Sequence, residues 1–216
     1  MTNTFAPFGF QQRAGVGSAP TYELSRQYIS ASYGTVIYQG DAVVPVTSTA
    51  TGYIARATAG TVALAGIFWG CEYLSTSQKK IVWSNYFPAA DVNSALAVTA
   101  YVINDPNAKF TVQTGNSNTT ATAITQAKVG QLINLSTSND NKAGTGGGGS
   151  TANGLSQMFA DQYTIGTTAT LPFYIADVIL DPPGANGTDV TSAYNWIIVG
   201  FNNVLTQGGG ARTGIS

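Results

Sequence analysis

The sequence predicts an all-β protein, made of β-barrel or β-sandwich modules with an extended N-terminal arm. Two observations lead to this prediction. Short runs of β-branched and aromatic residues recur along most of the chain, and clusters of Gly, Pro, Asn and Asp separate them at the spacing of β-turns. No amphipathic helical pattern extends beyond about two turns, although residues 124–131 could form a short helix.

Residues 1–27 are predicted to form the arm. Their phenylalanines lie among Gly and Pro residues, which interrupt helices and long strands. Because exposed phenyl rings are unfavourable in water, the arm either folds back onto its own domain or docks on a neighbouring subunit. For the second alternative, the candidate contact residues are Phe5, Phe8, Phe10, Arg13 and Tyr22.

A first β module is predicted over residues 28–90. Glycines within its longest apolar segment, residues 64–73, indicate bulges or close approach of two backbones. The polar residues 75–80 read as a loop. In chain order, the strand candidates of this module are residues 35–39, 42–44, 53–57, 64–73 and 81–83.

A second β module is predicted over residues 91–205, with a Gly-rich loop at 139–153, and a flexible tail follows at 206–216. The modules are expected to meet near residues 85–97, where Pro and Asp interrupt the rhythm of the strands. One elongated barrel is the alternative. The strand candidates of the second module are residues 97–103, 109–113, 129–135, 155–159, 170–180 and 194–202.

The composition argues against catalysis, metals and cofactors. The chain has no histidine and one cysteine, Cys71, so the usual proton-transfer group and the usual zinc ligands are missing. Cys71 is expected to be a small buried apolar residue. The glycine run at 146–149 is no phosphate loop, because no Lys-Ser or Lys-Thr pair follows it. We therefore expect a protein that is not an enzyme and has no cofactor, metal site or catalytic residue.

The carboxylates support the same view. Asp residues in turn sequences commonly bond to nearby backbone groups, which is the structural role expected for Asp41, Asp105, Asp140, Asp181 and Asp189. Asp177 and Glu72 instead interrupt apolar strands. They are expected to point outward from a one-sided sheet, or else to pair with Arg56 or Lys109 at an interface.

Charge also limits the partners. Only 9% of the residues are charged, compared with about 25% in an average protein, and this neutral surface suits packing against other protein. The formal net charge of −1 gives no footprint for nucleic acid or an anionic membrane. The N-terminal sequence lacks a secretion-signal pattern and no apolar run reaches about 18 residues, so a soluble protein made in the cytoplasm is expected.

Several short segments, read in order, resemble structural proteins found beside the major capsid protein in tailed bacteriophages. The resemblance spans about residues 30–205, and it depends on the order of the segments. They include Gly40-Asp41-Ala42-Val43-Val44, residues 64–73, Phe110-Thr111-Val112-Gln113, Val129-Gly130-Gln131-Leu132 and Trp196-Ile197-Ile198-Val199.

The resemblance implies a capsid decoration or cement protein, assembled in the host cytoplasm and located on the head surface of the virion. It implies the major capsid protein as partner, a homo-oligomer with a trimer favoured, and a terminal arm along the capsid. Two alternatives remain open. One is a phage tail or fibre component, and the other is a carbohydrate-binding β-domain lined by some of the 3 Trp, 11 Tyr and 9 Phe residues.

Overall fold

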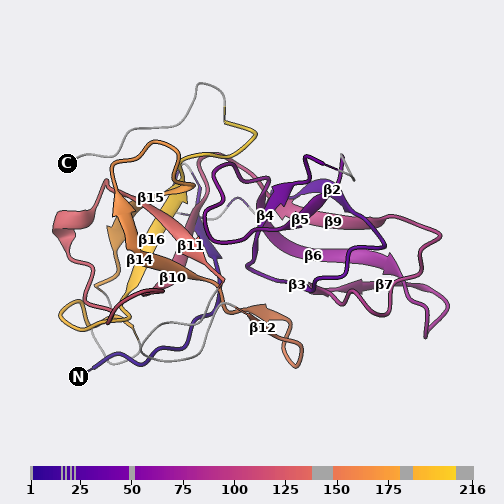
Figure 1. The fold of residues 1–216 in the computed structure, drawn as a ribbon, viewed down its shortest axis with the longest axis horizontal. Helices are drawn as coiled ribbons and strands as arrows, with labels where there is room; N and C mark the ends of the chain where they lie inside the picture. Colours follow the sequence, from indigo (N-terminus) through magenta and orange to yellow (C-terminus); the bar gives the residue numbers. More distant parts are fainter. Residues whose placement is uncertain are drawn as a thin grey trace.

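The structure is a computed structural model that describes residues 2–15, 17, 19, 21, 23–48, 52–137, 148–180 and 187–207. It confirms the all-β prediction. In these ranges the chain forms two six-stranded sheets, one of which contains a closed five-stranded barrel, and two short strand pairs. Figure 1 shows the barrel at one end of the molecule and the other large sheet at the opposite end.

The first sheet is antiparallel and centres on its longest strand, β6. Because β6 has nine residues, it pairs with β4 through its first residues and with β7 through its last four, while β9 covers its other side. The sheet consists of β2 (Ser25–Ile29), β9 (Val98–Ile103), β6 (Gly66–Leu74), β4 (Ala42–Pro45), β5 (Ile54–Arg56) and β7 (Ile81–Ser84).

Alternation along these strands gives the first sheet one buried face and one open face. On β9, Val98, Ala100 and Val102 are buried, whereas Thr99 and Tyr101 between them are partly exposed. The buried side chains join those of β2, β4 and β6 in one apolar core. The strand pair β3 (Ile37–Tyr38) and β8 (Tyr86–Phe87) adds Ile37 and Phe87 to this core.

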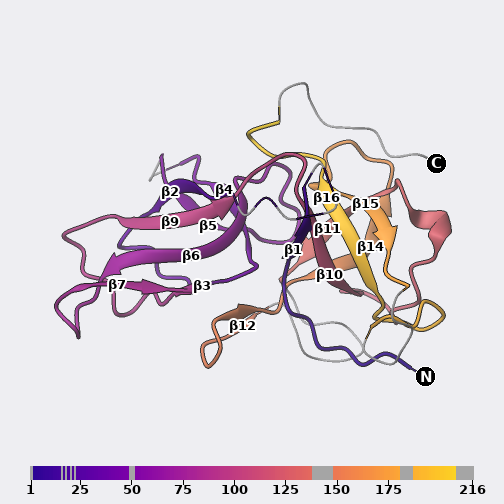
Figure 2. The same ribbon diagram turned by 180° about the vertical axis from the view of Figure 1, so that it is seen from behind.

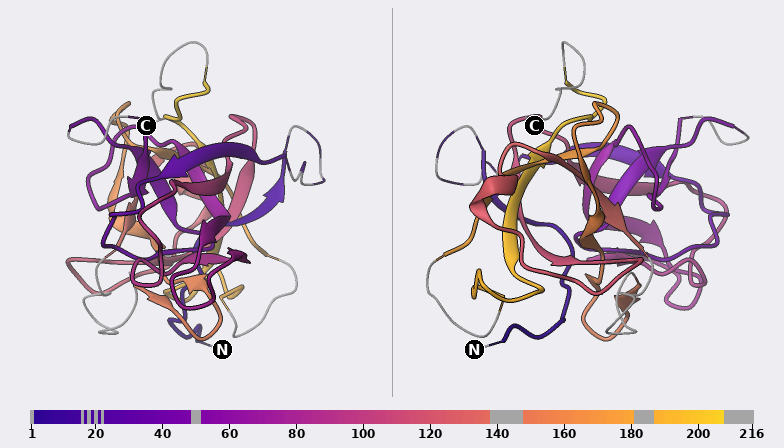
Figure 3. Two further views of the ribbon diagram at one scale, coloured as in Figure 1. Left: turned by 90° about the vertical axis from the view of Figure 1, so that its right-hand side faces the viewer. Right: turned by 60° about the vertical axis from the view of Figure 1, so that its left-hand side comes forward.

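The barrel contains β10 (Lys109–Gly115), β14 (Phe159–Gly166), β11 (Leu132–Ser136), β15 (Phe173–Val178) and β16 (Trp196–Phe201), in that order. It closes because β16 returns to pair with β10. The pairing of β10 with β14 is parallel, and the other neighbours in the ring are antiparallel. The right-hand view of Figure 3 looks almost along the barrel axis.

Phenylalanine rings fill much of the barrel interior. Phe110 meets Phe201 edge to face, with ring centroids 5.1 Å apart, and Phe173 stacks on Phe201 at 5.8 Å. All three rings are fully buried. Aromatic pairs in these geometries contribute about 0.5–1.5 kcal/mol beyond the area they bury, so the rings of β10, β15 and β16 help to hold the barrel together.

Three short elements complete the fold. Strand β1 (Gln11–Ala14) pairs with the beginning of β10 and lies beside it in Figure 2. Strands β12 (Gly149–Ser150) and β13 (Leu155–Ser156) form a small hairpin between the two large sheets (Figure 1). Of the possible helix over residues 124–131, a single 3-10 turn is present, η1 (Gln126–Lys128). The Gly-rich loop at 139–153 and the tail at 206–216 lie largely outside the described residues.

The boundary between the two sheets lies later than the predicted one at residues 90 and 91. Strand β9 falls within the predicted second module, but it pairs with β2 and β6 in the first sheet. The interruption that suggested a boundary is instead β8 and a turn that contains Asp91. The barrel core also includes Ile67 and Ile103 from the first sheet. The modules therefore share apolar core at their junction.

Candidate protein-interaction surface

The N-terminal arm packs on the barrel of its own chain, which is the first of the two alternatives for it. Phe5 meets Phe159 edge to face at 5.3 Å, and Phe8 meets Trp196 at 5.2 Å. Phe10 stacks on a barrel ring, Phe173, at 4.6 Å and is only 2% exposed. The prediction that Phe10 is a surface contact residue is therefore wrong. Phe10 is a core residue, because its ring completes the barrel interior.

The other two candidate contact residues are not brought together with these rings. Arg13 is exposed on β1, at a point where the register of β1 against β10 shifts. Tyr22 lies outside the described residues. Of the predicted set, Arg13 is thus the one whose side chain the structure places on an open surface, while Phe5 and Phe8 are half-buried.

Two buried amide side chains fasten the arm. The Asn3 side-chain amide donates to the carbonyl oxygens of Asp189 and Ala193, at 2.8 and 3.0 Å, and its oxygen accepts from the backbone N–H of Gly187 at 3.0 Å. Gln113 on β10 accepts from the N–H of Ala6 at 2.8 Å. Because each of these amide side chains forms hydrogen bonds with backbone groups, the arm is anchored by polar contacts as well as by aromatic rings.

A buried ion pair ties the first sheet to the β12–β13 hairpin. Asp41, which follows β3, accepts from Arg56 Nε at 2.7 Å and from the Ser156 hydroxyl at 2.6 Å. Arg56 also donates to the Gly148 carbonyl at 2.9 Å. Burial raises the pKa of Asp41, whereas the Arg56 charge and the hydrogen bonds from Arg56, Ser156 and the Tyr38 N–H act in the opposite direction. The pair is a structural junction, and its burial was not anticipated from the turn sequence.

The open face of the first sheet carries the exposed aromatic residues of this module. The antiparallel registers place residues of four neighbouring strands on this one face. Ile81 is 64% exposed, Trp83 57% and Tyr28 51%. We call this surface the outer face and define it by six residues: Arg26, Tyr28, Glu72, Ile81, Trp83 and Tyr101.

Contacts within the outer face hold its larger side chains in place. Trp83 lies against the backbone of Gly70, where an added Cβ would come within 2.9 Å of the indole ring. The Arg26 guanidinium lies 6.0 Å from the centre of the Tyr101 ring. Glu72 lies opposite Trp83 across the pair β6 and β7 and is half-buried. Glu72 therefore lies on the open side of the sheet, as expected.

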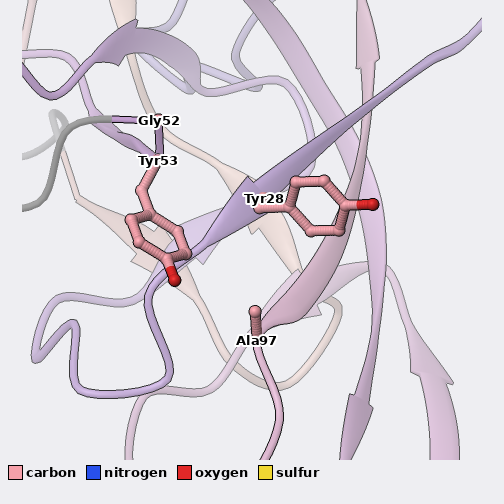
Figure 4. Close-up of a pocket in the computed structure, with 4 residues that line it drawn as sticks. All are labelled: Tyr28, Gly52, Tyr53 and Ala97. Carbon is pink, nitrogen blue, oxygen red and sulfur yellow. The ribbon is translucent and has the colours of Figure 1, made fainter.

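A pocket of about 340 Å³ lies at one edge of the first sheet. It is open to solvent and is lined by Tyr28, Gly52, Tyr53 and Ala97. Figure 4 shows Tyr53 and Tyr28 on opposite sides of the pocket with Ala97 below them, and the two hydroxyl groups point in different directions. The pocket forms here because β5, which Tyr53 precedes, curls back to contact β2.

A second hollow, of about 340 Å³, lies on the outside of the barrel. It brings Arg13 together with Lys109 and the outward-facing Asp177, over the side chain of Ile198. Asp177 is exposed, which confirms the expectation that it points away from the core. The register of β15 shifts between Ile175 and Asp177, and this bulge re-aims the side chain.

The Cys71 side chain has the surroundings of a core residue. Cys71 is fully buried, as expected, and burial raises the pKa of its thiol to about 12. Within the described ranges, no group of three or more His, Cys, Asp or Glu side chains is arranged to hold a metal ion. The same ranges contain no helix with the length and apolar character of a membrane span.

Comparisons of the chain with protein-family models, with curated proteins and with solved structures find nothing that matches it. Sequence reasoning pointed to the arm and missed the outer face. The one available signal was the alternation in Ile81-Val82-Trp83, which places two large apolar side chains on the same side of a strand.

Proposed function

We propose that this chain is a structural virion protein, a capsid decoration or cement protein that binds the outer surface of a phage head. The observation that carries the proposal is the outer face of the first sheet. It combines an exposed Trp, two Tyr residues and an Arg on one surface. These residue types contribute most to binding energy at protein interfaces, so the face is suited to packing against another protein.

The low charge of the chain supports a protein partner. Contacts made by apolar and aromatic groups are less weakened by salt than exposed ion pairs are. Such contacts suit a particle that meets variable ionic strength. The order of the sequence segments, which resembles proteins found beside phage capsid proteins, supplies the proposed identity of that partner as the major capsid protein.

The proposed role needs no reactive group and no cofactor. It needs a rigid body that attaches at many equivalent positions, where binding of several linked sites raises the effective concentration of each contact. Two features join the modules into such a body. One is the buried Asp41–Arg56 pair with its hydrogen bonds to Ser156 and Gly148, and the other is the shared apolar core at the junction. We propose a homo-oligomer, with a trimer favoured, which sedimentation equilibrium of the purified protein would test.

The proposal is tested by adding purified protein to expanded heads that lack it and measuring the bound fraction by cosedimentation. Saturable binding to heads is expected, with several copies of the protein bound to each group of neighbouring capsomers. Trp83→Ala removes the largest ring of the outer face and should weaken binding at least about tenfold, which corresponds to about 1.4 kcal/mol.

Tyr163→Ala is the matched control, because Tyr163 is 60% exposed but lies on β14 of the barrel. Its affinity for heads should stay within about twofold of wild type, a difference well below 1.4 kcal/mol. Failure of the wild-type protein to bind heads, together with its presence on purified tails, would overturn the proposal.

A further inference from the structure

The pocket between Tyr28 and Tyr53 shares Tyr28 with the outer face, but its other lining residues, Gly52, Tyr53 and Ala97, lie outside the six residues that define that face. Its volume of about 340 Å³ lies at the lower end of the range of roughly 300–1,000 Å³ typical of small-molecule sites. Among the described residues that line it, none carries a charge. These described residues therefore offer nothing to neutralise a phosphate, sulfate or carboxylate group.

The lining is amphipathic. A tyrosine presents an apolar ring and a hydroxyl that both donates and accepts hydrogen bonds. In Figure 4 the Tyr53 hydroxyl points down towards the level of Ala97, whereas the Tyr28 hydroxyl points away from both residues, so Tyr53 supplies the polar contact on the inner side of the pocket. Gly52 has a φ of 89° and nothing within 4 Å of the place where a Cβ would lie, so no side chain fills the space beside its backbone.

These features match the surface of a neutral sugar. A pyranose ring has a flat face of C–H groups, which can lie on an aromatic ring, and a rim of hydroxyls, which need hydrogen bonds or water. A purely apolar ligand would favour an enclosed site, but this one is open to solvent. We infer that the pocket formed by Tyr28, Gly52, Tyr53 and Ala97 binds a neutral sugar residue of a larger glycan.

The position of the pocket leaves it accessible in the proposed assembly. Tyr28 lies on β2 and Trp83 on β7, and β9 and β6 lie between these two strands. With neighbouring strands about 4.8 Å apart, this separation is about 14 Å. A protein partner that packs on Ile81 and Trp83 at the far end of the outer face, without reaching Tyr28, therefore leaves the edge near Tyr53 free for a glycan.

The test uses the purified full chain on an array of neutral, sialylated and sulfated oligosaccharides, followed by calorimetric titration with the neutral oligosaccharide that binds best. Tyr53→Ala removes one ring, and Ala97→Trp fills the pocket while keeping both tyrosines. Each change should weaken binding at least about tenfold, whereas Tyr163→Ala should change the affinity by less than about twofold.

Thermal melting of each variant confirms that it is folded before the titration. Trp83→Ala should bind the oligosaccharide like wild type, which separates this site from capsid docking. The inference is overturned if no neutral oligosaccharide binds, if only anionic ones bind, or if both pocket variants bind as tightly as wild type.

Discussion

The guanidinium of Arg56 and the carboxylate of Asp41 form a buried ion pair, with Nε and Oδ2 2.7 Å apart, where the first sheet meets the β12–β13 hairpin. Asp41 is fully buried, and the side chain of Arg56 is 14% exposed. Five hydrogen-bonding groups converge on this point, because Ser156, Gly148 and the N–H of Tyr38 also take part. The pair is linked to the hairpin through the Ser156 hydroxyl and to the Gly148 carbonyl just before it, beside the backbone hydrogen bonds that Gln39 makes with Gly154 and Ser156.

Replacement of Arg56 by Met is expected to lower the free energy of unfolding by about 3–5 kcal/mol, because it leaves the Asp41 carboxylate buried without its cation. Urea unfolding measures the change. The double variant Arg56→Met with Asp41→Asn should recover part of the loss, since no charge is then buried alone. A loss below about 1 kcal/mol in the single variant would contradict this account.

The Asn3→Ala variant should loosen the arm. Asn3 is 8% exposed and exchanges hydrogen bonds with the backbone of residues 187–193. Leaving those groups unsatisfied costs about 1–3 kcal/mol. Amide hydrogen exchange over residues 2–14 should become faster, while Asn107→Ala, an exposed control, should leave it unchanged. Equal exchange in both variants would show that Asn3 is not an anchor.

Acid should weaken the same anchor. Hydrogen bonds from Thr191 and Ser192 lower the pKa of Asp189 to about 2, from an ordinary value of 3.8. Since the folded-state pKa is the lower one, the stabilisation is complete above about pH 4 and is lost as the pH falls towards 2. Urea unfolding across this window should show a shallower pH dependence for Asp189→Asn than for wild type. Identical slopes would exclude this contribution.

Cys71 should be chemically inert in the folded protein. Its pKa of about 12 keeps it protonated near neutral pH, and the thiolate is the nucleophilic form. Iodoacetamide at about pH 8 should label the thiol only after denaturation, because burial also blocks access. Mass spectrometry gives the labelled fraction, and rapid labelling of the native protein would contradict the burial of this side chain.

The sequence was sufficient to predict the fold class and most strands, because alternation and turn residues are local signals. The segment 64–73 was expected as one long strand with glycine irregularities, and β6 has a register shift between Phe68 and Gly70. Which strands pair with each other is not a local property of the sequence. The assignment of β9 to the first sheet depends on which apolar face fits β6, and no local pattern encodes that choice.

The candidate site was harder to predict from the sequence, because local patterns do not show which segments pack together. The Phe residues of the arm look like exposed contacts until a barrel is available to receive Phe10. The alternation in residues 81–83 does not tell which side faces solvent, and Trp83 is exposed because Val82 takes the inward position against the core. The pocket beside Tyr53 joins residues 28, 52, 53 and 97, which only the curled sheet brings together.

The most direct test of the proposed function is a reconstruction of the virion by electron cryomicroscopy. We predict density on the outside of the head that fits the barrel and the first sheet, with the outer face around Trp83 against the major capsid protein. Density for this chain at the tail, or on the head with Trp83 facing solvent, would contradict the account.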